Sequence, residues 1–345
     1  MSSSSSVRSL FLALAAVVPL AASPSMAQAP VESVDGKRIN LIISFGAGGT
    51  YGIYGRLVAD HISRHLPGSP TVIVQHMPGA GGIVATNHLY NLAPKDGTTA
   101  AMLLKDIALT QIISPDTVRY DSRKFNWVGS VNQYYSVIMT WSASGANSIE
   151  AARKREVIMA SSGVGHQGTV LAQAMNEILG TRFRSITGYD NAGAMHMAME
   201  QGEVHGRIGS WESIKTGRAN WLKDKKVDLI VQSGFTKTSD LPDVPLLLDL
   251  VKDSSDRAVL ELIDSGSSVG WAVTLPPDVP AARVAAWRTA FDAMIKDPVF
   301  LAAASKMKVD VDSKSGSEVA SLLDRVLASK PEVFERTRKI AGTAN

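Results

Sequence analysis

Hydrophobic positions along this chain fall into two repeating patterns, short apolar runs and helical spacing. Residues 39–43 (INLII) form an apolar run that ends in a glycine-rich turn, 46–49 (GAGG). Behind the turn, apolar side chains recur on one helix face: Ile53, Leu57, Val58, Ile62 and Leu66. Glycines let main-chain N–H groups approach a ligand, and a helix N-terminus adds unpaired donors and partial positive charge. The stretch therefore predicts a strand, a turn and a helix that bind a small anion, such as a carboxylate or a phosphate.

Further units of this kind follow along the chain. We expect strands at 71–75, 100–104, 157–161, 183–187, 207–208, 228–232 and 271–275, with helices between them and after residue 281. A second glycine-rich loop, 76–82, follows the strand at 71–75, and a Gly/Ser loop, 161–168, follows the strand at 157–161. This alternation predicts an α/β fold with a largely parallel sheet. Ligands of such sheets bind beyond the carboxyl ends of the strands, where these loops would lie.

Two such α/β sets predict two lobes that face a cleft. Residues 127–141 are typical of an extended stretch that leaves the first lobe, and residues 270–275 would return the chain to it. We expect lobe 1 to comprise residues 28–131 and 265–345, and lobe 2 to comprise residues 132–264. The amphipathic helices near the C-terminus are expected to pack on lobe 1.

The first residues are typical of a signal peptide. Arg8 precedes an apolar run, 10–22, and Ser25 and Ala27 supply the small residues of a cleavage site. We therefore expect residues 1–27 to be removed on export. The alternative is a retained membrane anchor, which the shortness of the run disfavours. The chain has no cysteine, which excludes a lipid-anchored lipoprotein and disulfides. Together these features predict a soluble protein of a bacterial periplasm.

Composition narrows the possible functions. The chain has 345 residues, 45% of them hydrophobic, which suffices for one large or two medium domains with real cores. Its 35 basic and 32 acidic residues leave a formal net charge of only +3, with no basic block. This balance argues against nucleic-acid binding. No feature indicates an oligomer interface, so we expect a monomer.

Two motif matches lack the context that cofactor or metal binding needs. Gly46, Gly48 and Gly52 loosely match a dinucleotide fingerprint, but Gln75 stands where the fingerprint needs an acidic residue. His61 and His65 lie at helical spacing without the glutamate of a zinc protease between them. We therefore expect no cofactor and no metal.

A third match concerns catalysis. Residues 266–270 (GSSVG) fit the serine-hydrolase pattern G-x-S-x-G, with Ser268 as the nucleophile. That pattern requires a strand before the serine and a helix after it, whereas this one precedes an apparent strand. We interpret it as a polar turn and keep an exported hydrolase that uses Ser268 as the alternative function.

Two charged or titratable side chains are candidates for ligand contacts. His166 lies near a predicted helix N-terminus, where it either donates to a ligand carboxylate or bonds to the backbone. Arg207 suits a carboxylate because a guanidinium binds one bidentately. Its alternative is a surface ion pair with a residue such as Glu203.

Other candidates follow the predicted strands. Tyr189 and Asn191 come after the strand at 183–187 and can reach the same cleft. Phe45 and Tyr51 flank the first glycine turn and can cover an apolar or aromatic ligand body. Phe45 is equally typical of a core residue.

Several motifs, in their order and spacing, resemble the Bug/TctC family, the periplasmic solute receptors of tripartite tricarboxylate transporters. The motifs are SFGAGGTYG (44–52), MPGAGG (77–82), APKDG (93–97), ASSGVG (160–165), GYDNAG (188–193), GEVHGR (202–207), PDVPLL (242–247) and PPDVPAARV (276–284). They span nearly the whole chain after residue 27.

The resemblance implies a type II periplasmic-binding fold: two α/β lobes, mixed sheets with flanking helices, a hinge and an interlobe cleft. It implies that loop N–H groups and waters hold ligand carboxylates. The loop residues so implied are Gly48, Gly49, Thr50 and Tyr51 in one lobe, and Ser161, Ser162, Gly165 and His166 in the other. The implied ligand is a small carboxylate, aromatic or di/tricarboxylic, and the implied partners are membrane permease subunits of the transporter or a sensing protein. No enzymatic activity is implied.

Two positions depart from the family pattern. Family members often carry aspartate near the position of Gly52 and at the position of His205. Without these acids, less negative charge is available near the cleft to contact a ligand amino group. We therefore favour a simple carboxylate, with an aromatic body in view of Tyr51, over an amino acid.

Overall fold

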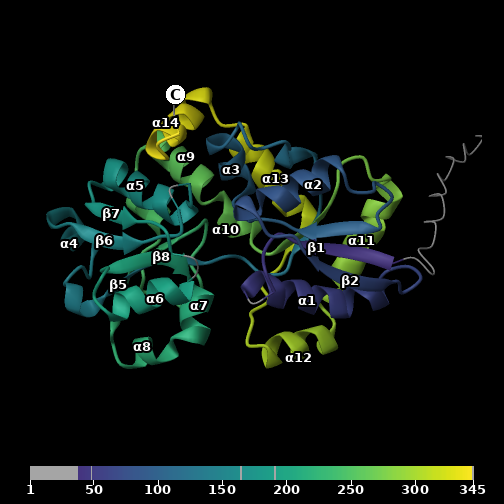
Figure 1. Cartoon of the computed structure of the whole chain (residues 1–345), viewed down its shortest axis with the longest axis horizontal. Coiled ribbons are helices and arrows are strands. Elements are labelled where there is room, and N and C mark those ends of the chain that lie inside the picture. Colours follow the sequence, from purple (N-terminus) through teal and green to yellow (C-terminus); the bar gives the residue numbers. More distant parts are fainter. Residues whose placement is uncertain (1–37, 48, 164, 190–191, 344–345) are drawn as a thin grey trace, which may run out of the picture. The chain divides into compact units, whose positions relative to one another are not determined.

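The computed structural model describes residues 38–47, 49–163, 165–189 and 192–343, and contacts join this part of the chain in one compact unit. The predicted signal peptide, residues 1–27, lies outside the described residues. Figure 1 shows two sheets as separate groups of strands, each flanked by helices. The α-helices are α1 Thr50–Ile62, α2 Ile83–Asn91, α3 Ile107–Ile113, α4 Ile149–Lys154, α5 Gln167–Leu179, α6 Ala192–Glu200, α7 Trp211–Gly217, α8 Ala219–Lys223, α9 Ser254–Ile263, α10 Ser265–Val269, α11 Ala281–Met294, α12 Pro298–Lys306, α13 Gly316–Leu327 and α14 Pro331–Ile340.

The first sheet has the strand order β11-β4-β10-β3-β1-β2. Its strands are β1 Arg38–Ile43, β2 Thr71–His76, β3 Thr99–Met102, β4 Asn126–Ser130, β10 Ala272–Leu275 and β11 Lys314–Ser315. Strand β1 runs parallel to β2 and β3, whereas β10 is antiparallel to β3 and β4. The carboxyl ends of β1, β2 and β3 therefore meet at one edge, as the sequence predicted for the glycine loops.

The second sheet has the strand order β7-β6-β8-β5-β9. Its strands are β5 Ser136–Trp141, β6 Val157–Ala160, β7 Phe183–Ile186, β8 Gly206–Ser210 and β9 Val227–Ser233. Strand β6 is parallel to β7 and β8, and β5 is antiparallel to β8 and β9. Both sheets are thus mixed, and the largely parallel sheet expected from strand–helix alternation is a parallel core with antiparallel additions.

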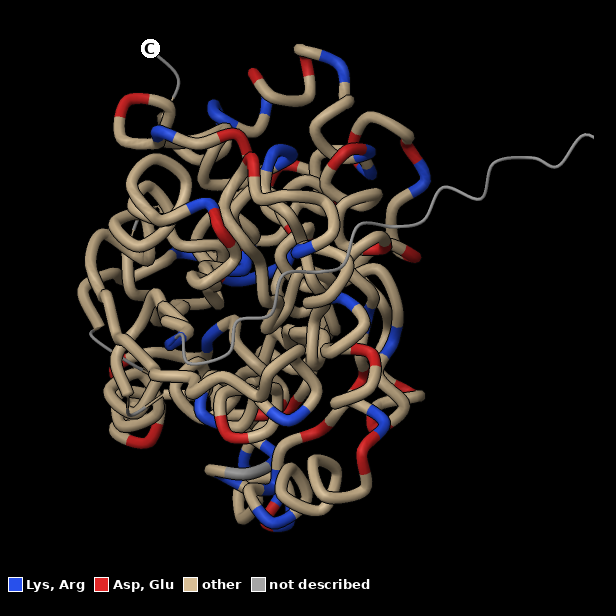
Figure 2. The backbone as a smooth tube through the Cα atoms, turned by 90° about the vertical axis from the view of Figure 1, so that its right-hand side faces the viewer, with Lys and Arg blue, Asp and Glu red and all other residues tan. Residues whose placement is uncertain are grey.

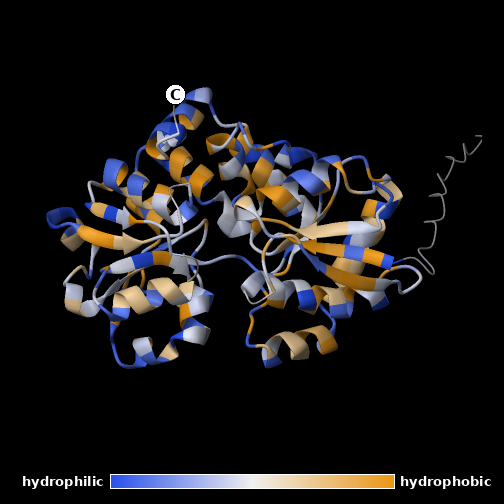
Figure 3. Ribbon diagram, in the orientation of Figure 1, coloured by the Kyte–Doolittle hydropathy of each residue, from blue (hydrophilic) through white to orange (hydrophobic). Residues whose placement is uncertain are grey.

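Apolar residues of β1 pack on both faces of the first sheet. Ile42 joins one core cluster, while Ile39, Leu41 and Ile43 join another on the opposite face. This double burial explains why the strand reads as a nearly continuous apolar run rather than an alternating one. Figure 3 shows the hydrophobic strands of this sheet between helices that carry both hydrophobic and hydrophilic residues.

The chain passes from the first sheet to the second through residues 131–135. The stretch 127–141, predicted as extended, is therefore two strands, β4 and β5, joined by this crossover. The strands of each sheet come from the segments predicted for the two lobes, and the lobe boundaries themselves stay a prediction. Basic and acidic residues are interspersed along the described backbone in Figure 2, in keeping with the small net charge.

One expectation needs correction. Residues 266–270, interpreted as a polar turn, lie mostly in the buried helix α10. Helix α14, expected to pack on lobe 1, contacts α3 of predicted lobe 1 and also α5 and α9 of predicted lobe 2. Arg336 bonds Glu177 of α5 and Asp256 of α9, each at 2.7 Å, and Arg338 Nε donates to the Ile112 carbonyl of α3 at 3.2 Å. A helix amphipathicity pattern identifies the buried face but not the neighbour that covers it.

Candidate ligand-binding cleft

A cavity of about 670 Å³ lies between the carboxyl end of the first sheet and the loop that precedes α5. Its lining includes seven residues that the sequence predicted: Phe45, Gly49, Thr50, Tyr51, Ser162, Gly165 and His166. Gly48 and Asn191 lie outside the described residues. A cavity of this size suits a small-molecule ligand, because such sites typically measure a few hundred cubic ångströms.

Hydrogen bonds at the end of β1 hold the first loop in place. The Ser44 backbone N–H and hydroxyl both donate to the Met102 carbonyl of β3, at 3.2 and 2.9 Å. His76 Nδ1 lies 2.8 Å from the Phe45 carbonyl, which ties the end of β2 to the same loop. The parallel register thus brings three strand ends together and fixes the backbone that enters α1.

Helix α1 begins at the cavity wall without a side-chain cap. Its N-cap residue, Gly49, has extended backbone (φ −109°, ψ 178°), makes no side-chain hydrogen bond, and is followed by no acidic residue in the first turn. The first N–H groups of a helix have no intrahelical acceptor, and they carry partial positive charge. The wall at Gly49, Thr50 and Tyr51 therefore offers donors to an anion.

The glycine at position 52 has a steric reason. A Cβ built on Gly52 would lie 2.2 Å from the Ala47 carbonyl oxygen. Only glycine permits this close approach of the loop to the first turn of α1. The departure from the family pattern noted at Gly52 in the sequence therefore goes with a loop that folds directly against α1.

The opposite wall is formed by Ser162, Gly163, Gly165 and His166, which precede α5, and by Gln167, its first residue. His166 is the N-cap of α5, and its Nδ1 accepts a hydrogen bond from the Gly168 N–H at 3.2 Å. This bond leaves Nε2 as the N–H donor of the neutral ring. Desolvation by the cleft walls, aided by the Lys105 and Arg207 charges, lowers the pKa of His166 to about 4. His166 is therefore both bonded to the backbone and placed at the cavity as a neutral donor.

Aromatic rings cover the cavity wall on the first sheet. The Phe45 and Tyr51 rings lie 4.4 Å apart, and Tyr134 lies 5.6 Å from Trp271 behind them. The Tyr51 hydroxyl accepts a hydrogen bond from the Lys105 N–H at 2.9 Å. Burial raises the pKa of Tyr51 well above its usual value, so the phenol is neutral. These rings offer an apolar surface to the body of a ligand.

Two charged residues of the cavity were not among the predicted site residues. Lys105 and Asp106 follow β3 directly and form an ion pair, with Nζ 2.5 Å from Oδ1. Lys105 Nζ also lies 4.3 Å from the centroid of the Tyr134 ring. The rule that ligands bind at the carboxyl ends of strands would have identified this pair, because it follows the predicted strand at 100–104.

A buried polar group lies behind the pair. Asp264 is 1% exposed and accepts hydrogen bonds from Gln167 Nε2, at 2.9 Å, and from the Ser233 hydroxyl. Burial raises its pKa to about 6, although the Ser233 hydrogen bond and the Lys105 charge oppose this shift. Asp264 links the β9 end and the start of α5 and does not line the cavity.

Three other predicted residues lie away from the cavity lining. Ser161 is buried, and its hydroxyl lies 2.6 Å from Thr169 Oγ1. Tyr189 packs at the edge of the core cluster on the second sheet. Arg207 is 6% exposed, with Nη1 2.8 Å from His196 Nε2. The surface ion pair suggested for Arg207 is absent from the described residues, and a ligand role for these three residues stays a prediction.

His205 bonds to the backbone of strand β6. Its Nδ1 accepts a hydrogen bond from the Ile158 N–H at 3.0 Å, and it does not line the cavity. The departure from the family pattern noted at His205 in the sequence therefore does not affect the charge of the cavity lining.

The structure gives Ser268 no hydrolase geometry. It lies in α10, a five-residue helix that precedes strand β10, and no hydrogen bond joins it to a histidine among the described residues. Within the same residues, no group of three His, Cys, Asp or Glu side chains is placed to hold a metal ion. None of the described helices is both long and apolar enough to cross a membrane.

Comparison with known proteins decides the family. The TctC family, described as tripartite tricarboxylate transporter family receptor, matches residues 54–336. The chain belongs to this family. The predicted TctC resemblance is thus confirmed, and this TctC protein is a solute-binding protein by family.

One curated relative is a UPF0065 protein of Bordetella bronchiseptica. It is 26% identical to the chain over 243 residues, which are 69% of the chain and 70% of the relative. A TctC solute binding protein from Polaromonas, solved without ligand, shares the fold with a TM-score of 0.68 and 17% identity. The similarity covers 88% of this chain and 98% of that one.

Two further solved structures carry ligands. An R. palustris protein with adipate has a TM-score of 0.64 and 18% identity, covering 90% of this chain and 99% of that one. MatC from Rhodopseudomonas palustris with bound malate has a TM-score of 0.63 and 16% identity, covering 89% and 99%. These likenesses, together with the two mixed sheets and their flanking helices, confirm the predicted type II periplasmic-binding fold.

Proposed function

We propose that this TctC protein is a periplasmic receptor that captures a small carboxylate and does no chemistry on it. One observation carries the proposal: the uncapped N-terminus of α1 faces a cavity that also contains Lys105 and a wall of aromatic rings. Backbone donors and a cation receive the carboxylate, and the rings cover the apolar body. The relatives solved with adipate and malate support a carboxylate as the ligand class.

The proposed ligand contacts include the loops of both walls. Gly49, Thr50 and Tyr51 would donate from the first wall, with Ser162, Gly165 and His166 opposite, and Gly48, outside the described residues, stays a predicted contact. Because the two walls belong to different predicted lobes, a change in their separation would open or close the site. Preorganised donors make such binding favourable, since little order has to be created when the ligand enters.

We further propose export by a cleaved signal peptide, residues 1–27, and delivery of the solute by a monomer to membrane permease subunits. The family supports a transport role, because its members are receptors of tripartite tricarboxylate transporters. The alternative to the permease subunits is a sensing protein that would receive the loaded receptor. Loading of the receptor would change the surface that such a partner meets.

A thermal-shift screen tests the proposal. Mono-, di- and tricarboxylates, aromatic acids and amino acids would be added to the purified protein. A ligand at 100 times its Kd stabilises the folded state by about 2.7 kcal/mol, which raises the melting temperature. We expect stabilisation by carboxylates and no turnover of the bound acid. Failure of every carboxylate to stabilise the protein would refute this function.

A further inference from the structure

We propose that Lys105 and Asp106 set the charge of the solute: Lys105 receives one carboxylate group, and Asp106 excludes a second. This inference rests on the proposed function and narrows it to monocarboxylates with an apolar or aromatic body. It differs from the ligands of the two relatives described above, since adipate and malate each carry two carboxyl groups.

The first step concerns the cation. The Lys105 side chain is 11% exposed and lines the cavity. Its ammonium lies against Asp106 and over the Tyr134 ring, two contacts that hold it at the wall. A charge withdrawn from water in this way interacts strongly with any charge that enters the cavity. Lys105 is therefore suited to bind the ligand carboxylate.

The second step concerns the charge of the lining. Helices α1 and α5 both begin at the cavity, and neither has an acidic residue in its first turn. Each N-terminus is equivalent to roughly half a positive charge. The Lys105 and Asp106 charges cancel, and His166 is neutral near pH 7. Behind the lining, the charges of Arg207 and Asp264 are opposite. Among the described residues that line the cavity, Lys105 is therefore the only side-chain cation, and no second one is left for another carboxylate.

The third step concerns the position of Asp106. A Cβ built on Gly266 of α10 would lie 2.2 Å from Asp106 Oδ1 and 3.0 Å from the Lys105 carbonyl oxygen. The Asp106 carboxylate thus occupies space that only glycine leaves open, and it stays beside Lys105. A second ligand carboxylate near this pair would face a fixed negative charge, which is unfavourable in a partly desolvated site.

The fourth step concerns the rest of the lining. Apolar and aromatic side chains make up much of it: Phe45, Tyr51, Ile83, Leu104, Ile113 and Tyr134. A carboxylate placed among these groups would lose its water without gaining a partner, which is costly. An aliphatic or aromatic ligand body would gain from the same surface. Charge and surface therefore agree on a monocarboxylate.

Matched pairs of acids test the inference by isothermal titration calorimetry at pH 7.5. Hexanoate is compared with adipate, in which a carboxylate replaces the terminal methyl group, and benzoate with terephthalate, in which a carboxylate replaces the para hydrogen. We expect the wild-type protein to bind the better monoacid at least tenfold more tightly than its diacid. Equal or tighter binding of both diacids would overturn the inference and leave the proposed function intact. Failure of all four acids, and of the wider carboxylate screen, would refute both.

Variants then assign the effect to the ion pair. Asp106→Asn should reduce the preference for the monoacid at least tenfold, because the repelling charge is gone. Lys105→Met should weaken monoacid binding at least tenfold. The control is Asp292→Asn, which removes an exposed carboxylate of α11 and should leave both affinities unchanged. An unchanged preference in a folded Asp106→Asn protein would overturn the role of Asp106.

A zwitterion is the main competing ligand, because it offers a partner to each member of the pair. Phenylalanine and 3-phenylpropanoate form the matched probes, since they differ by the amino group alone. We expect the wild-type protein to prefer 3-phenylpropanoate. A preference for phenylalanine would overturn the inference, and would assign Asp106 to an ammonium group. Circular dichroism and melting temperatures of each variant show that the comparison is made on folded protein.

Discussion

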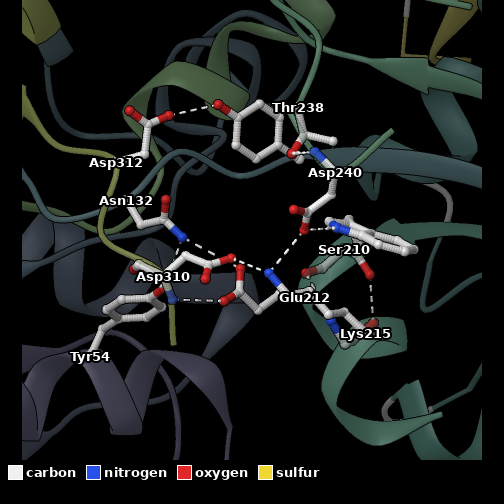
Figure 4. Close-up of polar contacts among 12 residues, drawn as sticks. Tyr54, Asn132, Ser210, Glu212, Lys215, Thr238, Asp240, Asp310 and Asp312 are labelled. Carbon is white, nitrogen blue, oxygen red and sulfur yellow. Dashed lines mark hydrogen bonds and ion pairs between the residues drawn. The ribbon is translucent and has the colours of Figure 1, made fainter. Parts of the chain in front are cut away.

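The Asn132 side-chain amide donates a hydrogen bond to the Tyr54 hydroxyl at 2.8 Å, which joins the crossover between the two sheets to helix α1. Figure 4 shows this bond in a polar cluster that also contains Glu212 and Lys215 of α7 and Asp310, which follows α12. Lys215 Nζ lies 2.7 Å from Asp310, and Glu212 Oε1 accepts from the Asp310 N–H at 3.1 Å. The cluster connects elements from both predicted lobes beside the start of α1.

Removal of the Asn132 amide should destabilise the protein measurably. Asn132 is 1% exposed, and Asn132→Ala removes the donor to the buried Tyr54 hydroxyl, at a cost of about 1–3 kcal/mol. The neighbouring Gln133 bonds Asp312 at the surface, so Gln133→Ala should cost less than about 1 kcal/mol. Urea unfolding of both variants checks this. Equal losses would show that burial of the crossover amide has no special energetic weight.

A side chain at position 49 should block the site and spare the fold. The Gly49 backbone is extended, and a Cβ there would meet no atom within 4 Å, so Gly49→Val places its methyl groups in the cavity. We expect binding of the best carboxylate from the screen to weaken at least a hundredfold. The unfolding free energy should fall by about 1 kcal/mol or less, since valine is a poorer N-cap than glycine.

Gly46 provides the matched control in the same loop. A Cβ there also meets no atom within 4 Å, but Gly46 does not line the cavity. Gly46→Val should therefore keep the wild-type affinity in the same calorimetric titration. Normal binding by Gly49→Val, or equal losses in both variants, would remove the first loop from the ligand site.

The pH dependence of stability should report the buried Asp264 carboxyl. Burial raises its pKa from 3.8 to about 6, so between these values the folded protein holds a proton that the unfolded chain has lost. The stability that this group contributes is full below pH 3.8 and is lost as the pH rises through 6. The unfolding free energy of the wild type, minus that of Asp264→Asn, should fall by on the order of 3 kcal/mol as the pH rises over this range. Urea titrations from pH 4 to 7 measure it, and a flat difference would contradict the assignment.

Substitution of Ser268 should have no effect on ligand handling. Ser268 lies outside the cavity lining, and its helix lacks the geometry of a nucleophile elbow. Ser268→Ala should therefore bind carboxylates as the wild type does, and neither protein should release product from nitrophenyl esters. Ester turnover that disappears in Ser268→Ala would restore the hydrolase alternative.

Local sequence patterns were sufficient to predict much of the frame of the site. The apolar run 39–43, the glycine turn and the helical spacing of apolar residues after Ile53 predict a strand, a loop and a helix from local sequence alone. The parallel arrangement of such units then brings loop ends together, which is why Gly49, Thr50 and Ser162 all line the cavity. Lys105 and Asp106 carried the same signal, as charged residues at the end of an apolar strand.

Other features depend on contacts between distant parts of the chain. Tyr134 reaches the cavity because Trp271, far along the chain, packs behind its ring. Arg207 is buried because Gly209 leaves room for its guanidinium: a Cβ there would lie 2.2 Å from Nη2. Arginine in a strand ordinarily predicts an exposed charge, and no local sequence pattern predicts the room that Gly209 leaves for the guanidinium. Likewise, α10 forms within tertiary packing from a sequence whose Gly and Ser residues are typical of a turn.

Isothermal titration of the purified protein, with recovery of the ligand, tests the central claim most directly. The acid would be the one that stabilises the protein most in the screen, and it would be identified by mass spectrometry after the titration. We predict binding of one molecule per chain, weakened by Gly49→Val, with the acid recovered unchanged. Conversion of the acid, or binding that Gly49→Val leaves intact, would contradict capture in this cavity without chemistry.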